Sequence, residues 1–202
     1  MIKNGRLLYH LTALENLASI LQHGLKPRCD LNNDEFNDVA DGEILDSRAN
    51  HSLDNFVPFH FFAKNPFDYS VQRTYSEKDF VLISVQRTVA RANGWKIVPT
   101  HPLAKAGYQI LDYDAGFIEI DWELMEERNY DDKACKVVCM AECLSPTTVS
   151  SDLIFCIYIK DTRVKAVVDK LVNLHNVCCH VDINPAMLSL IHISEPTRPR
   201  SI

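Results

Sequence analysis

The chain has 202 residues, of which 47% are hydrophobic and 24% are charged, and a net charge of −6 argues against a protein that binds nucleic acid through overall positive charge. No apolar run approaches the roughly 20 residues of a membrane span, and the first residues lack the apolar segment of a signal peptide. Seven cysteines form an odd set without zinc-site spacing, so we expect reduced thiols, no structural metal and a cytoplasmic location.

The first expected elements are a strand and a helix. The segment RLLYHLT (6–12) reads as a short strand, and ALENLASILQHGL (13–25) then carries apolar residues at helical spacing. Thr12 and Glu15 form the T-x-x-E pattern of a capping box at a helix start, and Gly24 is the expected helix end.

The middle of the chain alternates between loops and short elements. Residues 26–55 are polar and rich in Asp and Asn, and a loop of that length is usually functional or disordered. FVPFHFF (56–62) reads as a strand in which Pro58 favours a sheet edge or a strand start. The pattern then predicts a helix within 65–76, a strand at 79–85, a helical turn ending at Gly94 and a short strand at 96–100.

The second half begins with a long segment, 101–134, for which we expect mostly irregular structure with one helical piece at 121–127. A strand at 136–144, a strand at 152–159, a helix at 162–175 and a strand at 177–184 are expected to follow. With no internal repeat or linker, this order predicts a single α+β domain.

The end of the chain has an unusual composition. LSLIHISEPTRPRSI, residues 188–202, resembles the translation of a sequencing adapter. We therefore expect the natural domain to occupy residues 1–187 and treat 188–202 as adapter read-through.

One acidic residue stands inside an apolar segment. In KVVCMAECLSP (136–146), alternation along the expected strand places Glu142 on the same face as Val138, Met140 and Leu144. Burial of an ionised carboxylate is costly unless it is paired. Glu142 therefore either reaches water at an edge, or it serves a cleft in which a carboxylate stabilises an oxocarbenium-like transition state.

Other candidate site residues lie in the first quarter of the chain. His10 and Thr12 project to one side of an extended segment and either have local structural roles or bind a ligand near the helix start. Arg48 lies in the polar loop and would matter if that loop covered a phosphate-bearing ligand. The sequence contains no G-x-G-x-x-G, P-loop or H-E-x-x-H motif, so Rossmann-type dinucleotide binding, P-loop hydrolysis and zinc proteolysis have no support.

Three segments resemble a known family when they are taken together. LYHLTALENLASILQHGLKPR resembles the opening of ADP-ribosyltransferase-fold proteins, in which a strand ending in His-x-Thr precedes a helix. DVADGEILDSRANHSLDNFVPFHFFAKNPFDY and KACKVVCMAECLSP are similar to the arginine loop, the V-P-F-Y-F segment and the glutamate strand of the DarT family. The resemblance covers roughly residues 6–187 and implies an ADP-ribosyltransferase-like fold with central mixed or antiparallel sheets, flanking helices and long functional loops.

The resemblance also implies an activity. DarT proteins are toxins of bacterial toxin–antitoxin systems, among them anti-phage systems, and transfer ADP-ribose from NAD to a base of single-stranded DNA without a metal. It further implies a macrodomain (DarG-like) antitoxin that removes the ADP-ribose. The residues that match the family's catalytic pair are Arg48 and Glu142, and those that match its NAD contacts are His10, Leu11, Thr12, Ser19 and Arg48.

The chain departs from the family pattern in three places. The family's double arginine is Ser47-Arg48, its V-P-F-Y-F tyrosine is His60, and the expected substrate loop, about 107–141, is acidic. These differences leave the modified base open. They also leave two alternatives: an ADP-ribosyltransferase that acts on protein or RNA, and an inactive nucleotide-binding domain.

Overall fold

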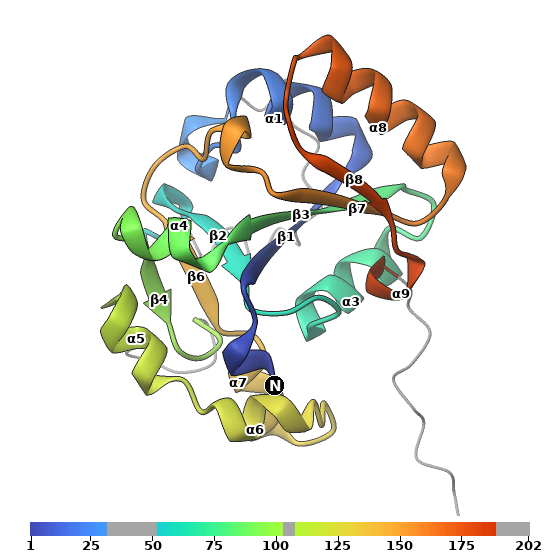
Figure 1. Ribbon diagram of the computed structural model, residues 1–202. Coiled ribbons are helices and arrows are strands. Elements are labelled where there is room, and N and C mark those ends of the chain that lie inside the picture. The colour runs from blue at the N-terminus through green and yellow to red at the C-terminus, as the bar shows by residue number, and fades with distance from the viewer. Residues whose placement is uncertain (32–51, 103–107, 189–202) are drawn as a thin grey trace, which may run out of the picture.

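The computed structural model describes residues 1–31, 52–102 and 108–188. Its centre is an eight-stranded sheet with the order β5-β4-β6-β2-β1-β3-β7-β8 (Figure 1). Neighbouring strands are antiparallel except for the parallel pair β7 and β8. The strands are β1 (Leu7–Ala13), β2 (Val57–His60), β3 (Phe80–Gln86), β4 (Lys96–Val98), β5 (Leu111–Asp112), β6 (Glu142–Ser145), β7 (Cys156–Ile159) and β8 (His180–Ile183).

Helices cover both faces of this sheet. The α-helices are α1 (Leu17–His23), α3 (Pro66–Thr74), α4 (Arg87–Ala92), α5 (Tyr113–Glu119), α6 (Trp122–Glu127), α7 (Lys133–Val138), α8 (Thr162–Leu174) and α9 (Pro185–Leu188). The 3-10 turns are η1 (Ile2–Asn4), η2 (Leu14–Asn16), η3 (Arg28–Asp30), η4 (Leu53–Asn55) and η5 (Ser151–Leu153). The expected α+β fold is confirmed.

Alternation along β1 separates the core into two layers. Leu8 belongs to the large cluster that includes buried residues of α1 and α8, whereas Leu11 belongs to a second cluster with Val71 of α3 and Leu188 of α9. Leu188 is the first residue of the expected read-through, and the rest of that segment lies outside the described residues. One strand thus carries side chains into both layers.

The start of α1 differs from the expected capping box. The 3-10 turn η2 separates β1 from α1, and no side chain caps the helix at Asn16. The Asn16 amide instead donates to Thr12 Oγ1 at 3.3 Å, so Thr12 holds the turn rather than the helix end. Gly24 ends α1 as expected, with a φ of 81° that favours glycine.

The predicted strand at 136–144 was wrong in its first half. Residues Lys133–Val138 form α7, in which the Asp132 carboxylate accepts from the Ala134 amide at 2.8 Å, and β6 begins only at Glu142. The buried residues of α7 are Cys135 and Val138, and their three-residue spacing is typical of a helix. A short apolar run fits both periodicities, and the cap decides between them. Cys135, Cys139 and Cys143 therefore do not share one strand face.

The segment before α7 is also more ordered than expected. The helical piece at 121–127 is confirmed as α6, but α5 was missed. Gly116 lowers the helix propensity of α5, and it is needed there because a Cβ atom at Gly116 would lie 2.5 Å from Ile97 Cβ. The close packing of α5 on β4 explains why a poor helix former occupies this position.

The sheet is divided between β1 and β2, which share one paired position, Tyr9 with His60. Hydrogen bonds from the Arg87 amide to the Arg6 carbonyl and from the Leu14 amide to the Asp79 carbonyl extend the β1–β3 ladder at its two ends. They show that even-numbered residues of β1 turn their backbone groups to β3. The backbone groups of Tyr9 and Leu11 therefore face β2.

Pro58 explains where the ladder between β1 and β2 stops. Continuing the register from Tyr9 and His60 places Leu11 opposite Pro58. Proline has no N–H, so it cannot donate to the Leu11 carbonyl as a ladder partner would. We expected Pro58 at an edge or a strand start. The strand order places β2 inside the sheet, but β1 and β2 form no ladder pair at Leu11 and Pro58, and we call this break in the ladder the split.

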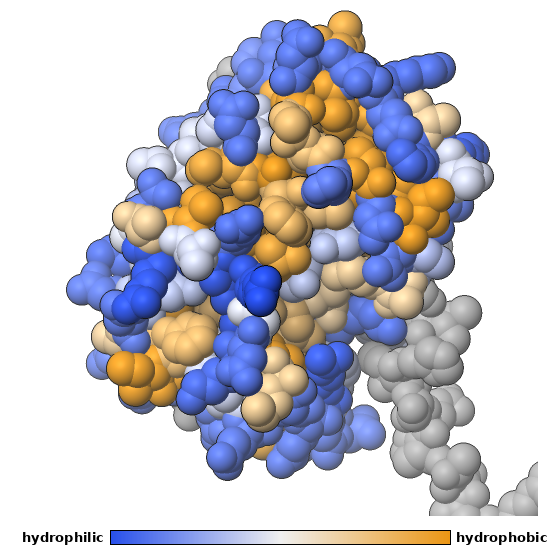
Figure 2. All heavy atoms as spheres, in the orientation of Figure 1, coloured by the Kyte–Doolittle hydropathy of each residue, from blue (hydrophilic) through white to orange (hydrophobic). Residues whose placement is uncertain are grey.

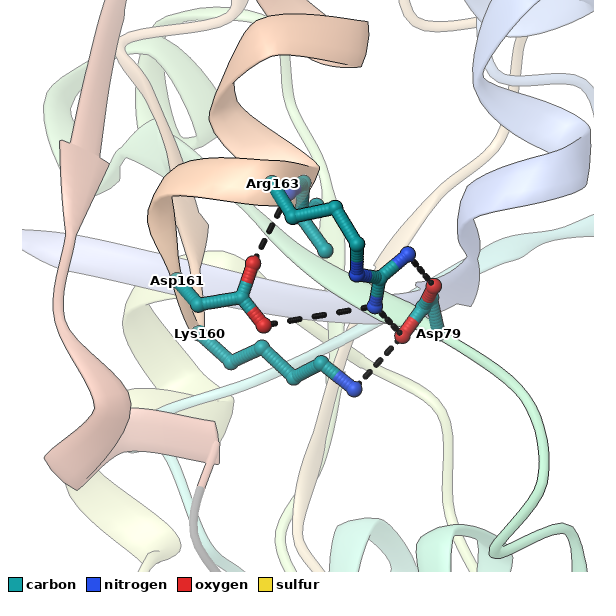
Figure 3. A network of polar contacts seen from close by, with 5 residues as sticks. Asp79, Lys160, Asp161 and Arg163 are labelled. Carbon is teal, nitrogen blue, oxygen red and sulfur yellow. Dashed lines mark hydrogen bonds and ion pairs between the residues drawn. The ribbon is translucent and has the colours of Figure 1, made fainter.

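An ionic cluster fixes the point at which the chain leaves β1. The Asp79 carboxylate pairs with Lys160 at 2.5 Å and Arg163 at 2.8 Å, and both partners lie at the junction of β7 and α8 (Figure 3). These two cations lower the pKa of Asp79 to about 2. Because the Asp79 carbonyl also accepts from the Leu14 amide at 2.8 Å, the cluster links the end of β1 to α8.

The surface mixes charged and apolar groups. Figure 2 shows apolar side chains gathered over β7, β8 and α8, interrupted by hydrophilic residues. Within the described residues, every helix is too short or too polar to cross a bilayer.

Candidate active site

Glu142 belongs to a row of side chains that crosses the sheet. It lies opposite His60 of β2 and opposite Val98 of β4, and His60 in turn lies opposite Tyr9 of β1. Paired residues of neighbouring strands project to the same face. Glu142, His60 and Tyr9 therefore share one face of the sheet, and Glu142 is only 6% exposed.

Two apolar clusters flank this row on the same face. On one side, Phe67 of α3 lies against His60, with ring centroids 5.7 Å apart. On the other side, Leu53 and Leu144 pack with Val98. The polar row thus runs between two apolar clusters that do not merge.

His60 also contacts the backbone just before Glu142. Its Nδ1–H donates to the Ala141 carbonyl at 3.2 Å, and the side chain is 6% exposed. The imidazole therefore ties β2 to the turn from which β6 and Glu142 begin.

His10 lies at the split. Its Nδ1–H donates to the Pro58 carbonyl at 2.8 Å, and its ring centroid is 5.5 Å from that of Phe59. The imidazole thus connects β1 to β2 at the place where Pro58 ends the backbone ladder. This contact fixes the tautomer, because the nitrogen that faces a carbonyl must carry the proton.

The other predicted NAD contacts lie on β1 and α1. Leu11 turns its backbone toward the split, Thr12 is 1% exposed and bonded to Asn16, and Ser19 is half-buried in α1. Alternation places the side chains of His10 and Thr12 on the face opposite to Tyr9, and therefore opposite to Glu142. The structure therefore does not bring the side chains of His10 and Thr12 onto the same face of the sheet as Glu142.

Arg48 lies outside the described residues, and so does residue 107, the first of the predicted substrate loop. The described part of that loop consists of β5, α5, α6, α7 and their connections. Arg87, the first residue of α4, connects this loop to the sheet. Its guanidinium donates to the carbonyls of Leu7, Lys3 and Phe61, and lies 5.6 Å from the Trp122 ring. A buried arginine that was not singled out in the sequence thus supports this half of the site.

Tyr9 is a further residue of the site that was not predicted from the sequence. Its pKa is raised because burial disfavours the phenolate, so it remains a neutral phenol. Its position next to His10 in the sequence could have indicated Tyr9, but its place on the same face as Glu142 depends on the pairing of three strands.

Over the described residues, no group of three or more His, Cys, Asp or Glu side chains is arranged to bind a metal ion.

Comparison with known families decides the relationship. The family model described as "ssDNA thymidine ADP-ribosyltransferase, DarT" matches residues 9–189. The chain belongs to the DarT family. The expected family is therefore confirmed, and its description names thymidine, which the sequence had left open.

Similar DarT structures have the same fold. Thermus sp. 2.9 DarT in complex with ADP-ribosylated ssDNA matches with a TM-score of 0.79 at 17% identity, over 90% of this chain and 95% of that chain. Thermus sp. 2.9 DarT in complex with NAD+ matches with a TM-score of 0.75 at 16% identity, over 91% and 98%. The expected ADP-ribosyltransferase-like fold is confirmed.

A curated relative is longer than this chain. The DNA ADP-ribosyl transferase–DNA ADP-ribosyl glycohydrolase fusion protein of Thermosipho africanus (strain H17ap60334) is 26% identical over 188 residues. The alignment covers 88% of this chain but 48% of the fusion protein, so the chain spans about half the length of this DarT relative.

Proposed function

We propose that residues 1–187 form a DarT domain that transfers ADP-ribose from NAD to thymidine in single-stranded DNA and releases nicotinamide. The observation that carries this proposal is the position of Glu142, a buried carboxylate at the start of β6, in register with His60 and next to the split. A carboxylate in such a place suits a reaction that develops positive charge on a ribose.

NAD would lie across the split. The Leu11 backbone would bind the nicotinamide amide, because Pro58 leaves the Leu11 carbonyl without a ladder donor. His10 would approach the ligand from one side of the opening, with Thr12 and Ser19 near the start of α1. A ligand in this position lies between His10 and Glu142, which explains why they project from opposite faces.

The bond that breaks joins nicotinamide to the anomeric carbon of ribose. Glu142 stabilises the positive charge that develops as nicotinamide leaves, and the base of the DNA strand then attacks the anomeric carbon. Arg48, which matches the family's catalytic arginine, would orient the phosphates or the base and assist removal of the proton from the attacking nitrogen. A base in a single strand is accessible without extrusion from a duplex.

The biological setting follows from the family. The Thermosipho africanus relative joins a transferase to a DNA ADP-ribosyl glycohydrolase. We propose that this chain acts with a DarG-like macrodomain partner that reverses the modification, as the toxin of a toxin–antitoxin pair. All seven cysteines are free, which supports a cytoplasmic location.

Mass spectrometry tests the proposal. The protein is incubated with NAD and matched oligonucleotides that contain or lack thymidine, alongside the Glu142→Gln variant. We expect one ADP-ribose to be added only to thymidine-containing strands, with a loss of about 100-fold or more in the variant. Nicotinamide release with no DNA product would move the target to protein or RNA, and neither signal from folded protein would indicate an inactive nucleotide-binding domain.

A further inference from the structure

Six of the cations in the described part of the chain are already neutralised by ion pairs. Within residues 1–31, 52–102 and 108–188, ion pairs join Lys78 to Glu15, Arg91 to Asp114, Lys96 to Asp112, Lys160 and Arg163 to Asp79, and Lys165 to Asp169. Lys64 and Arg128 form no ion pair with any residue of those ranges. They are therefore available to an external anion.

These two cations lie on loops that are fastened to each other. The Tyr130 hydroxyl, two residues after Arg128, donates to the Lys64 carbonyl at 3.0 Å. The Arg128 guanidinium lies 5.1 Å from the centroid of the Phe62 ring, which is part of the Lys64 loop. A guanidinium held over an aromatic ring is oriented in advance for binding a phosphate.

Both residues have an uncommon backbone conformation. The φ angle is 64° at Lys64 and 49° at Arg128, although neither is glycine. The Lys64 turn is held by its amide, which donates to the buried Asp68 carboxylate at 3.0 Å. At Arg128 this conformation ends α6, as is common at a helix C-terminus. At Lys64, a non-glycine residue in a loop, it is rare, and such strain concentrates at ligand-binding positions.

The position of the pair relative to the split indicates its ligand. Lys64 lies four residues beyond His60, and the Arg128 loop leads into α7 and then into Glu142. From the Tyr9–His60 pair, the split opens toward Pro58, whereas Lys64 lies on the other side of that pair. Lys64, to which the Arg128 loop is fastened, thus follows the strand residue that faces Glu142, on the far side of that residue from the proposed NAD position.

From this geometry we infer that Lys64 and Arg128 bind the phosphodiester backbone of the DNA strand beside the reacting base. This inference rests on the proposed function and adds a substrate contact to it. The acidic character of the 107–141 segment is then no obstacle, because DNA would contact two oriented cations and not the segment as a whole. The neighbouring acidic groups are the exposed Glu127 and Asp131 beside Arg128 and the buried Asp68 that accepts from the Lys64 amide, and Asp132 is engaged at the α7 cap.

The test is the double variant Lys64→Gln/Arg128→Gln against a control, Lys26→Gln/Lys170→Gln, which removes the same charge from the segment after α1 and from α8. Binding is followed by anisotropy of a labelled thymidine-containing oligonucleotide over a range of salt concentrations. We expect about 10-fold weaker binding and a salt slope reduced by about 1.4, at about 0.7 per phosphate contact of a single strand. The KM for DNA should rise in parallel, while the KM for NAD measured by nicotinamide release should stay unchanged.

An equal effect of the two double variants would overturn the inference, and so would a change in the KM for NAD alone. Failure of the proposed function has a different signature, because the unmodified protein would then give no DNA product. The binding measurement does not depend on turnover, so it decides on the cations in either case.

Discussion

His60 and Glu142 lie directly opposite each other on β2 and β6, and the His60 imidazole also donates to the carbonyl of Ala141. The His60 side chain therefore fixes the backbone of Ala141, the residue before the proposed catalytic Glu142. The family pattern has a tyrosine at the position of His60.

The first prediction concerns this contact. His60→Ala should lower kcat by about 10- to 100-fold with little change in the KM for NAD, because Glu142 loses the bond that orients its strand. His60→Asn should recover part of the loss, since its amide N–H can donate from the position of Nδ1. Steady-state nicotinamide release measures both variants, and equal defects in the two would exclude a role for the Ala141 bond.

The second prediction concerns Pro58. Pro58→Ala supplies an N–H opposite the Leu11 carbonyl and allows the ladder to extend across the split. The free energy of unfolding should rise by about 1 kcal/mol while NAD binds more weakly. Urea unfolding and NAD titration measure the two effects, with Pro66→Ala as the control at a helix start. A destabilised variant with unchanged NAD affinity would contradict the prediction.

The third prediction concerns the pH dependence of stability. Burial raises the pKa of Asp68 from 3.8 to about 7, and its Oδ1 atom is buried without a hydrogen-bond partner in the described structure. Because the folded-state pKa is the higher one, the associated stability is complete below about pH 4 and is lost as pH rises through about 7. A shift of this size corresponds to about 4 kcal/mol.

Asp68→Asn should therefore flatten the dependence of unfolding free energy on pH between 4 and 8, as measured by urea unfolding. The exposed Asp169→Asn serves as the control. A variant that keeps the same slope as the parent would show that another group titrates in this range.

The fourth prediction concerns the cluster around Asp79. Asp79→Asn should cost about 1 kcal/mol at pH 7, because exposed ion pairs contribute little individually. The folded-state pKa is lowered to about 2, so this stability is present above about pH 4 and is lost as pH falls through about 2. Unfolding curves of the two proteins should thus converge at low pH. A constant difference would attribute the effect to packing rather than charge.

The sequence predicts elements well where local signals agree. The strand before Thr12, the helix that ends at Gly24 and the helix at 162–174 all have clear periodicity or clear ends. It fails where tertiary packing overrides propensity, as at Gly116 in α5, and where a short apolar run fits two periodicities, as in α7.

The candidate site shows the same division. Glu142 could be selected from sequence because a carboxylate interrupts an apolar run. Tyr9 and His60 lie in one row with Glu142 only because β1, β2 and β6 are neighbours in the sheet, and local sequence does not encode this order. The availability of Lys64 and Arg128 likewise depends on which acidic residues fold next to which basic ones.

The split between β1 and β2 has a consequence for cooperativity. With one ladder pair joining them, the β1-β3-β7-β8 half and the β2-β6-β4-β5 half are suited to open as separate cooperative units, each with its own hydrogen-exchange protection. A dinucleotide that contacts both halves would join these units into one. Binding would then slow amide exchange in strands that the ligand never touches.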